Sequence, residues 1–256
     1  MAKKPSNRAA VVAVAAAATT KTVSTKTTTA TKTTTRKQQV QGESKSVLSS
    51  SCLLPHSLLL RSNSVQYQQS LQTIVPGAVY TATSFLSQQE CQAWIHYVEC
   101  ESPNRMIYTN HPASRSMAQR ECYRWQRQDW TMADALFDRM ACFMSLFEAL
   151  VPQQRPIAAN GNLRVYKYER GMSFGKHVDG NEKTDRGTTQ MTVLIYLSTC
   201  VGGATRFHYG RRQEVISEVE EGKILFHVHG DQCLDHEADA VQKGVKYVLR
   251  TDLVFR

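Results

Sequence analysis

From residue 162 to the C-terminus, short runs of β-branched and aromatic residues are separated by glycines. The runs are LRVYKY, QMTVLIYL, EVISEV, KILFHV and KYVLRTDLVF. The glycines that punctuate this part of the chain are Gly171, Gly175, Gly202, Gly203, Gly210, Gly222, Gly230 and Gly244. Short strands separated by turn residues are typical of antiparallel sheets, so the pattern predicts a β-sandwich or jelly roll.

Before residue 162 the apolar residues follow a helical spacing. VYTATSF (79–85) predicts a strand, and Ser87 with Glu90 forms a capping box that predicts the start of a helix. A second helix is predicted from Thr131 to just before Pro152. Its apolar stripe consists of Ala133, Leu136, Phe137, Met140, Met144 and Phe147. Helices that precede a run of strands predict an α+β fold in which N-terminal helices buttress the sheet.

The connection before the second helix carries Arg120, Arg124, Trp125 and Arg127. We interpret it as a solvated polar connector. A substrate entrance lined by these side chains is the alternative.

Residues 1–75 have a different composition, rich in Lys and Thr and then in Gln and Ser. Few large apolar residues are present to offset the entropy of ordering, so we expect a disordered tail. The folded domain is then 76–256, with its motif-bearing core at 162–256. A basic start before AAVVAVAAAA weakly matches a secretory signal, and the acid-free Thr-rich stretch weakly matches an organelle transit peptide. We favour a plain tail and a location in the cytoplasm or nucleus, with organelle import and secretion as alternatives.

The net charge of +9 belongs mainly to the tail. Residues 1–42 contain no acidic residue and carry the basic residues Lys3, Lys4, Arg8, Lys21, Lys26, Lys32, Arg36 and Lys37. The remainder is nearly neutral, which gives no electrostatic case for a nucleic-acid groove. The seven cysteines contain no CxxC pair, and we interpret them as free thiols in a reducing compartment. No apolar run reaches the length of a membrane span.

His177 and Asp179 are two residues apart, so on a strand both side chains point to the same face. His236, far downstream, supplies the third ligand that a facial triad needs. A second His-x-Asp pair, His229 with Asp231, has only the nearby His236 downstream and is the weaker candidate.

The remaining histidines are assigned no ligand role. We interpret His227 as a strand neighbour, His229 as a loop residue, and His96 and His208 as structural or surface residues. Cys233 is the one cysteine near His236, and we do not expect it to be a ligand. A cupin-like metalloenzyme that uses His227 and His229 remains the alternative.

Two imidazoles and a carboxylate leave positions open on the metal, which suits non-haem Fe(II) better than a closed structural zinc site. On the last predicted strand, Lys246 and Arg250 share one face. A buried cation there requires an anionic partner. We favour Lys246 as the residue that pairs with this anion, with Arg250 as the alternative.

Taken together, YKYERGMSFGKHVDG, TVLIYLST, VGGATRF and LDHEADAVQKGVKYVLRTDLVF resemble the catalytic domain of prolyl 4-hydroxylase-like Fe(II)/2-oxoglutarate dioxygenases. SFLSQQECQAWI resembles the entry helix of that family. The resemblance implies a double-stranded β-helix, with Fe(II) held by His177, Asp179 and His236. It also implies that Lys246 holds the tail of 2-oxoglutarate and that Tyr168 and, less directly, Thr192 line its pocket. Gly202, Gly203, Thr205 and Phe207 match a turn and strand that shape the barrel.

The same resemblance implies O2 as co-substrate, ascorbate as reductant, and succinate and CO2 as products. A prolyl residue of a protein is the default substrate of the family, and a small molecule is also open. Ala238 departs from the pattern, because the family often has glycine at this position. A non-catalytic module that binds metal and 2-oxoglutarate, and an oxygenase directed at nucleic acids, are the alternative functions. The sequence does not determine the oligomeric state.

Overall fold

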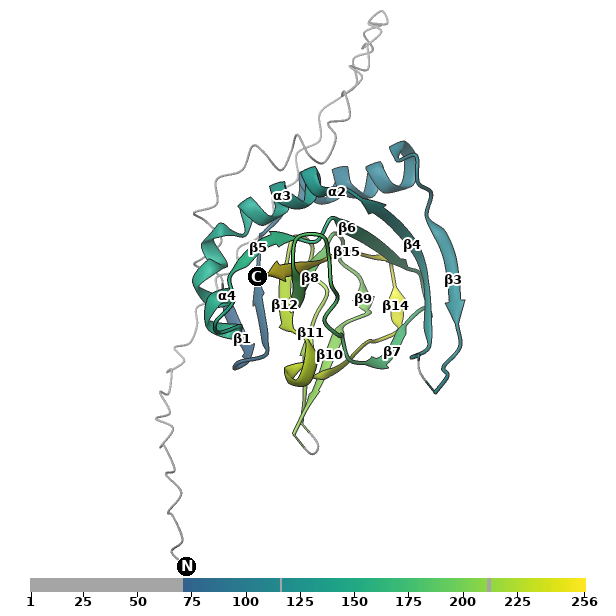
Figure 1. Ribbon diagram of the computed structural model, residues 1–256. Coiled ribbons are helices and arrows are strands. Elements are labelled where there is room, and N and C mark those ends of the chain that lie inside the picture. Colours follow the sequence, from purple (N-terminus) through teal and green to yellow (C-terminus); the bar gives the residue numbers. More distant parts are fainter. Residues whose placement is uncertain (1–70, 116, 211–212) are drawn as a thin grey trace, which may run out of the picture. The chain divides into compact units, whose positions relative to one another are not determined.

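A 13-stranded antiparallel sheet organises the computed structural model, which describes residues 71–115, 117–210 and 213–256 (Figure 1). The predicted tail lies outside the described residues up to residue 70. From there the chain forms β1 (Gln72–Val75), which pairs with β2 (Val79–Ala82). β1 therefore lies within the last residues of the predicted tail 1–75, and the strand predicted from VYTATSF is confirmed over Val79–Ala82.

One half of the sheet has the strand order β1-β2-β12-β8-β15-β6-β4, with β5 paired to β15 and β3 paired to β4. These strands are β12 (Ile224–Val228), β8 (Thr188–Tyr196), β15 (Lys246–Phe255), β6 (Asn162–Tyr168), β4 (Arg120–Gln128), β5 (Pro156–Ala159) and β3 (Ile107–His111). The strands predicted around LRVYKY, QMTVLIYL, KILFHV and KYVLRTDLVF are β6, β8, β12 and β15.

The other half continues from β4 in the order β7-β13-β10-β11. Its strands are β7 (Phe174–His177), β13 (Asp235–Ala238), β10 (Thr205–Tyr209) and β11 (Gln213–Ser217). A separate small pair joins β9 (Val201–Gly202) to β14 (Val241–Lys243), and the short 3-10 turn η5 (Gly230–Gln232) precedes β13. The sheet curls so that its halves form the jelly roll that the sequence predicts (Figure 1).

The helices lie together along the outside of the sheet (Figure 1). They are α2 (Gln88–His96), the π-helical turn η3 (Tyr97–Glu101), α3 (Trp130–Arg139), the 3-10 turn η4 (Ala141–Phe143) and α4 (Met144–Leu150). The predicted capping box is present, because the Glu90 amide donates to Ser87 Oγ and the Glu90 carboxylate accepts from the Ser87 amide. The buttressing helices of the α+β prediction are thus confirmed.

The second predicted helix is wrong in its continuity. Asp129, rather than a later residue, caps α3, and the chain then tightens into η4 before α4 begins. The tighter turn brings Phe143 into the core, whereas Phe137 of the predicted stripe is only partly buried. Phe143 and Phe147 pack edge-on against Phe226 of β12, with ring centroids 5.1 Å and 4.9 Å away.

The predicted polar connector is also wrong, since its residues form β4 and β4 pairs with β6 along most of its length. Trp125 is fully buried, and its indole N–H donates to Ser102 Oγ. Arg120 lies over the rings of Tyr166 and Phe174, so cations and aromatic rings pack together on this strand. The buried positions of β4 do not alternate strictly, which hides the strand in the sequence.

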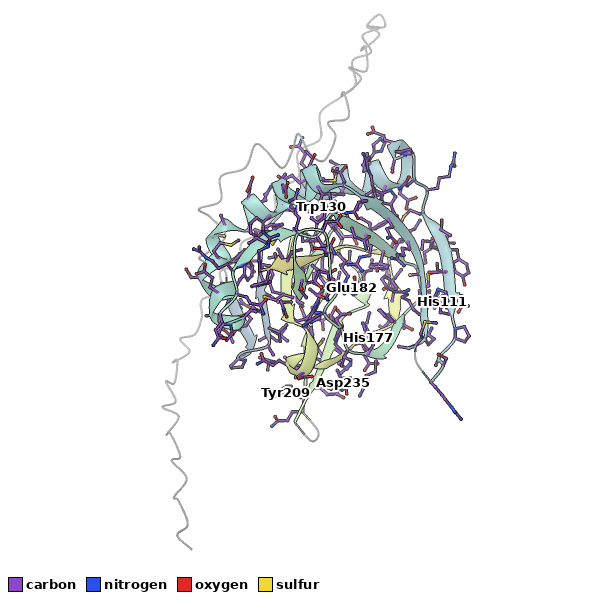
Figure 2. All side chains as sticks on the ribbon, in the orientation of Figure 1. His111, Trp130, His177, Glu182, Tyr209 and Asp235 are labelled. Carbon is purple, nitrogen blue, oxygen red and sulfur yellow. The ribbon has the colours of Figure 1, made fainter. Side chains whose placement is uncertain are left out.

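The histidines, which the sequence alone does not distinguish by location, lie in different parts of the fold. Figure 2 shows His177 within the ring of strands, whereas His111 lies on the outer hairpin formed by β3 and β4. Among the described residues, no helix has the length and apolar character needed to cross a bilayer.

Candidate metal centre

His177 and His236 face each other across two neighbouring strands. His177 ends β7, and the antiparallel register places it directly opposite His236 on β13. Residues opposed in this way point to the same side of the sheet, and the centroids of the two imidazoles are 4.2 Å apart. Strand pairing therefore brings together two side chains that are distant in the sequence.

Asp179 joins this pair from a loop. The sequence analysis placed Asp179 on a strand with His177, but β7 ends at His177 and Asp179 lies just beyond it. One carboxylate oxygen, Oδ1, is 3.9 Å from His177 Nε2, and the other, Oδ2, is 3.7 Å from His236 Nε2. The ligand atoms of the three residues all lie within 4.8 Å of one another, so one ion can be reached by all three.

Both imidazoles are oriented by the backbone. Nδ1 of His177 lies 2.9 Å from the carbonyl of Gly175, and Nδ1 of His236 lies 2.9 Å from the carbonyl of Leu234. A carbonyl can only accept, so each Nδ1 donates its proton and each Nε2 carries a lone pair directed toward Asp179. Histidines that bind metals in proteins are usually held in this way.

Lys246 and Tyr168 are also cross-strand neighbours, on β15 and β6. The lysine is only 2% exposed, and its Nζ donates to the carbonyl of Gly203 at 2.7 Å. Gly203 has φ +69°, a conformation that side chains rarely adopt, and a Cβ there would lie tightly, 3.3 Å from Lys246 Cδ. The glycine turn therefore lets the buried ammonium sit against the backbone.

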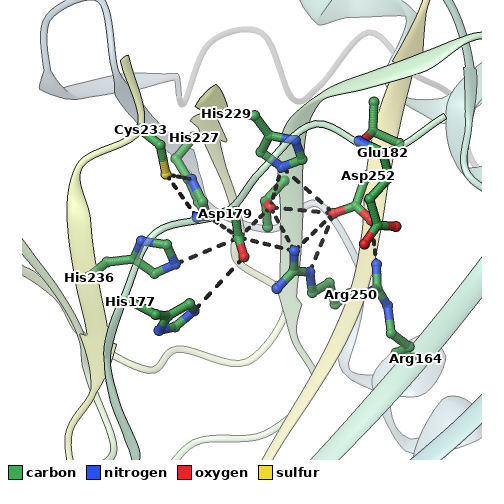
Figure 3. A network of polar contacts seen from close by, with 12 residues as sticks. Arg164, His177, Asp179, Glu182, His227, His229, Cys233, His236, Arg250 and Asp252 are labelled. Carbon is green, nitrogen blue, oxygen red and sulfur yellow. Dashed lines mark hydrogen bonds and ion pairs between the residues drawn. The ribbon is translucent and has the colours of Figure 1, made fainter. Parts of the chain in front are cut away.

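Arg250 and Thr192 contact Asp179 directly. Nη2 of Arg250 lies 3.0 Å from Oδ2 of Asp179, and Thr192 Oγ1 donates to the same oxygen at 2.7 Å (Figure 3). Arg250 also pairs with Asp252 at 3.2 Å, and Asp252 is paired in turn with Arg164. Oδ2 of Asp179, the oxygen nearer to His236, is thus held by a buried polar network.

Three further residues of the centre were not assigned to it from the sequence. His227 opposes Thr192 in the strand register, and its Nε2 is 3.4 Å from Asp179 Oδ2. His229 Nε2 is 2.7 Å from Thr192 Oγ1, and Cys233 Sγ accepts from the Asp179 amide at 3.3 Å. A polar residue within an otherwise apolar strand, KILFHV, is the feature that could have identified His227, whereas His229 and Cys233 lie beyond the end of this strand.

A single pocket contains the predicted site residues. Its lining includes His177, Asp179, His236, Lys246, Tyr168, Arg250 and Thr192, together with His227. The residues come from both halves of the sheet, so the curl of the jelly roll creates the pocket. Ala238 lies on β13 without strain, because among the described residues only Ser84 and Gln153 combine a side chain with a positive φ.

Residues 163–251, which carry all of these side chains, match the family model described as the 2OG-Fe(II) oxygenase superfamily. This part of the chain is therefore similar to the 2OG-Fe(II) oxygenase superfamily. No curated protein has a significant sequence match to the chain.

Solved structures show the same fold at low sequence identity. The viral collagen prolyl hydroxylase of Paramecium bursaria Chlorella virus-1, in complex with 2OG, matches with a TM-score of 0.52 and 16% identity, covering 71% of this chain and 98% of the viral one. A 2OG-Fe(II) oxygenase family oxidoreductase from Burkholderia pseudomallei matches with a TM-score of 0.50 and 12% identity, covering 76% and 92%. A prolyl hydroxylase from Trichoplax adhaerens, in complex with a hypoxia inducible factor peptide, matches with a TM-score of 0.50 and 14% identity, covering 70% and 84%. The core therefore has the double-stranded β-helix of prolyl hydroxylases.

Burial and neighbouring charges set the protonation states of the candidate metal centre. It lowers the pKa of His177 to about 4, an effect to which the neighbouring His236 adds. Burial also lowers the pKa of His236, so both imidazoles are neutral near pH 7, the form that binds metal. For Asp179, burial raises the pKa, but Arg250, His227 and His236 outweigh it and hold the pKa well below its usual range. The site thus offers two neutral nitrogens and one carboxylate.

Proposed function

We propose that this protein is an Fe(II)- and 2-oxoglutarate-dependent dioxygenase whose metal is held by His177, Asp179 and His236. The observation that carries the proposal is the cross-strand pair His177–His236, with Asp179 beside it, in the same pocket as a buried lysine. Two neutral imidazoles and a carboxylate fit Fe(II) and leave positions open on an octahedral ion. When bound, the iron and 2-oxoglutarate supply the oxidising chemistry with O2, and succinate and CO2 are released.

Lys246 is the proposed partner of the distal carboxylate of 2-oxoglutarate. It lines the pocket on the strand opposite Tyr168, and its ammonium is buried without a carboxylate partner among the described residues that contact it. Tyr168 is proposed to donate a hydrogen bond to the co-substrate. Arg250 and Thr192, which the sequence analysis grouped with them, are instead proposed to orient Asp179, since both contact its Oδ2. Ascorbate is proposed as the reductant that keeps the iron in its ferrous state.

A peptide is the substrate class that we favour, with a prolyl residue as its first candidate. Two structural neighbours are named as prolyl hydroxylases, and one of them holds a peptide. A surface hollow that includes His177 supports this choice. Its lining also includes Met117 and Val178, which are 55% and 57% exposed. Exposed apolar side chains next to a reaction centre offer contacts to an extended peptide.

Anaerobic binding tests the co-substrate assignment without turnover. With Mn(II) as a stable substitute for Fe(II), 2-oxoglutarate should bind to the wild-type protein, and its affinity should collapse when Mn(II) is omitted. Binding that is equally strong without metal would contradict a metal-chelated co-substrate. Mass spectrometry of proline-containing peptides and of oligonucleotides after aerobic incubation then tests the substrate class, since only the true class gains an oxygen atom.

A further inference from the structure

His227 is a buried histidine with an unused nitrogen. It is 2% exposed, on β12, and it lines the same pocket as the predicted triad. Its Nε2 makes no hydrogen bond within the described part of the chain, although Asp179 Oδ2 is 3.4 Å away. A buried nitrogen without a partner costs free energy, and a bound metal ion would remove that cost.

Cys233 also lies beside this imidazole, close to its other nitrogen, Nδ1. It follows the turn η5, and its Sγ is 3.9 Å from Nδ1 of His227. The ring of His227 is also close to that of His236, with centroids 4.5 Å apart. One ligand atom from each of His227, Cys233 and His236 lies within 4.8 Å of the others, and Figure 3 shows the three side chains converging on the same space beside Asp179.

The donor chemistry of this cluster differs from that of the triad. A thiolate with two imidazoles is a soft set that Zn(II) favours, whereas the triad has no sulfur. Asp179 lies beside this cluster, because its Oδ2 is 3.4 Å from His227 Nε2 and 3.7 Å from His236 Nε2. These separations are close to the ~3.4 Å expected between tetrahedral ligands with bonds of about 2.1 Å.

We propose that His227, Cys233 and His236 form a second metal position that is selective for Zn(II). His236 has only one nitrogen to give, because its Nδ1 is engaged by the carbonyl of Leu234. Both positions need the same Nε2, so zinc and the iron of the triad exclude each other. Zinc bound to Cys233 therefore removes His236 from the triad and blocks the site. The proposed zinc position depends on these residues alone, so it does not require the catalytic function proposed for the triad.

X-ray absorption at the zinc edge tests the position in the intact wild-type protein. One equivalent of Zn(II) should give a single sulfur neighbour at about 2.3 Å among nitrogen and oxygen ligands. The Cys233→Ser variant should lose that sulfur neighbour. A matched control is Cys142→Ser, which changes another partly buried free thiol on the outer helices and should leave the zinc spectrum unaltered.

Affinity gives an independent reading. Zn(II) binding to Cys233→Ser and to His227→Phe should weaken by roughly 10–100-fold or more, because even partners outside the ligand sphere contribute that much. Mn(II), which prefers oxygen and nitrogen, should lose far less affinity. A wild-type zinc spectrum without sulfur overturns the proposal whether or not any variant folds. Equal zinc affinity of Cys233→Ser and the wild type overturns it as well.

Discussion

The guanidinium of Arg250 lies 3.0 Å from Asp179 and 3.2 Å from Asp252, and so bridges two buried carboxylates. These contacts support the proposal that Lys246, rather than Arg250, binds the distal carboxylate of 2-oxoglutarate. Arg250 is already paired, and the neighbouring charges raise its pKa despite burial. Lys246 contacts only a backbone carbonyl and aromatic rings among the described residues, and is therefore the cation available to an incoming dicarboxylate.

The first prediction concerns Lys246. Lys246→Met should weaken 2-oxoglutarate binding by roughly 10–100-fold, because a charge-assisted hydrogen bond contributes about 1.5–3 kcal/mol. Titration of the Mn(II)-loaded protein under anaerobic conditions measures this. Lys223→Met, at another buried lysine that lines no part of the pocket, is the control and should bind normally. Normal binding by Lys246→Met together with a loss in Arg250→Met would reverse the assignment.

A second prediction follows from the charge of the same lysine. Burial lowers the pKa of Lys246 to about 8, so its ammonium is present below that pH and lost above it. The affinity for 2-oxoglutarate should therefore fall as pH rises through that value, approaching tenfold per pH unit beyond it. Lys246→Arg, which keeps its charge, should abolish this fall. A pH-independent affinity in the wild type would show that the lysine does not titrate in the free site.

A third prediction concerns the support of Asp179. Thr192→Val removes the hydroxyl that donates to Oδ2 of Asp179 but keeps the shape of the side chain. Metal affinity should fall by roughly 10–100-fold, as for other partners of metal ligands. Thr189→Val, at an equally buried threonine of the same strand, is the control, since it contacts the Glu182 amide instead. If both variants bind Mn(II) equally well, Thr192 does not position the carboxylate.

A fourth prediction addresses the helices outside the barrel. Arg139 at the end of α3 pairs with the capping residue Glu90 of α2 at 2.5 Å, and both side chains are buried. Arg139→Met leaves a buried carboxylate unpaired and should reduce the free energy of unfolding by about 3–5 kcal/mol. Urea denaturation measures the loss. The double variant Glu90→Gln/Arg139→Met should recover much of it, and a double variant as unstable as the single one would contradict the pairing argument.

Much of the fold could be predicted because its strands are separated by glycines and carry β-branched runs. The start of α2 could also be predicted, because the capping box at Ser87 depends only on neighbouring residues in the sequence. By contrast, the break at η4 and the strand β4 depend on tertiary packing. Phe143 is buried because it packs against Phe226 of β12. Arg120 is accommodated within a strand because it packs against an aromatic ring of a neighbouring strand.

The candidate metal centre likewise has features that the sequence predicts and features that depend on tertiary packing. The spacing of His177 and Asp179 is visible in the sequence, and their convergence with His236 follows from the expected sheet. The sequence could not distinguish Arg250 and Thr192, which contact Asp179, from residues that would bind the co-substrate. Only the register of β8 and β15 shows that both face Asp179. His227 looked like an ordinary strand residue, since its nearness to Cys233 depends on the turn η5.

Succinate formation is the most direct test of the whole account. Purified protein supplied with Fe(II), 2-oxoglutarate, ascorbate and O2 should convert 2-oxoglutarate to succinate, and His236→Ala should reduce the rate to background. His208→Ala is the matched control, because its imidazole lies between Glu214 and Glu237 outside the triad, and it should retain activity. Succinate production by His236→Ala at the wild-type rate would contradict the assignment of the metal centre.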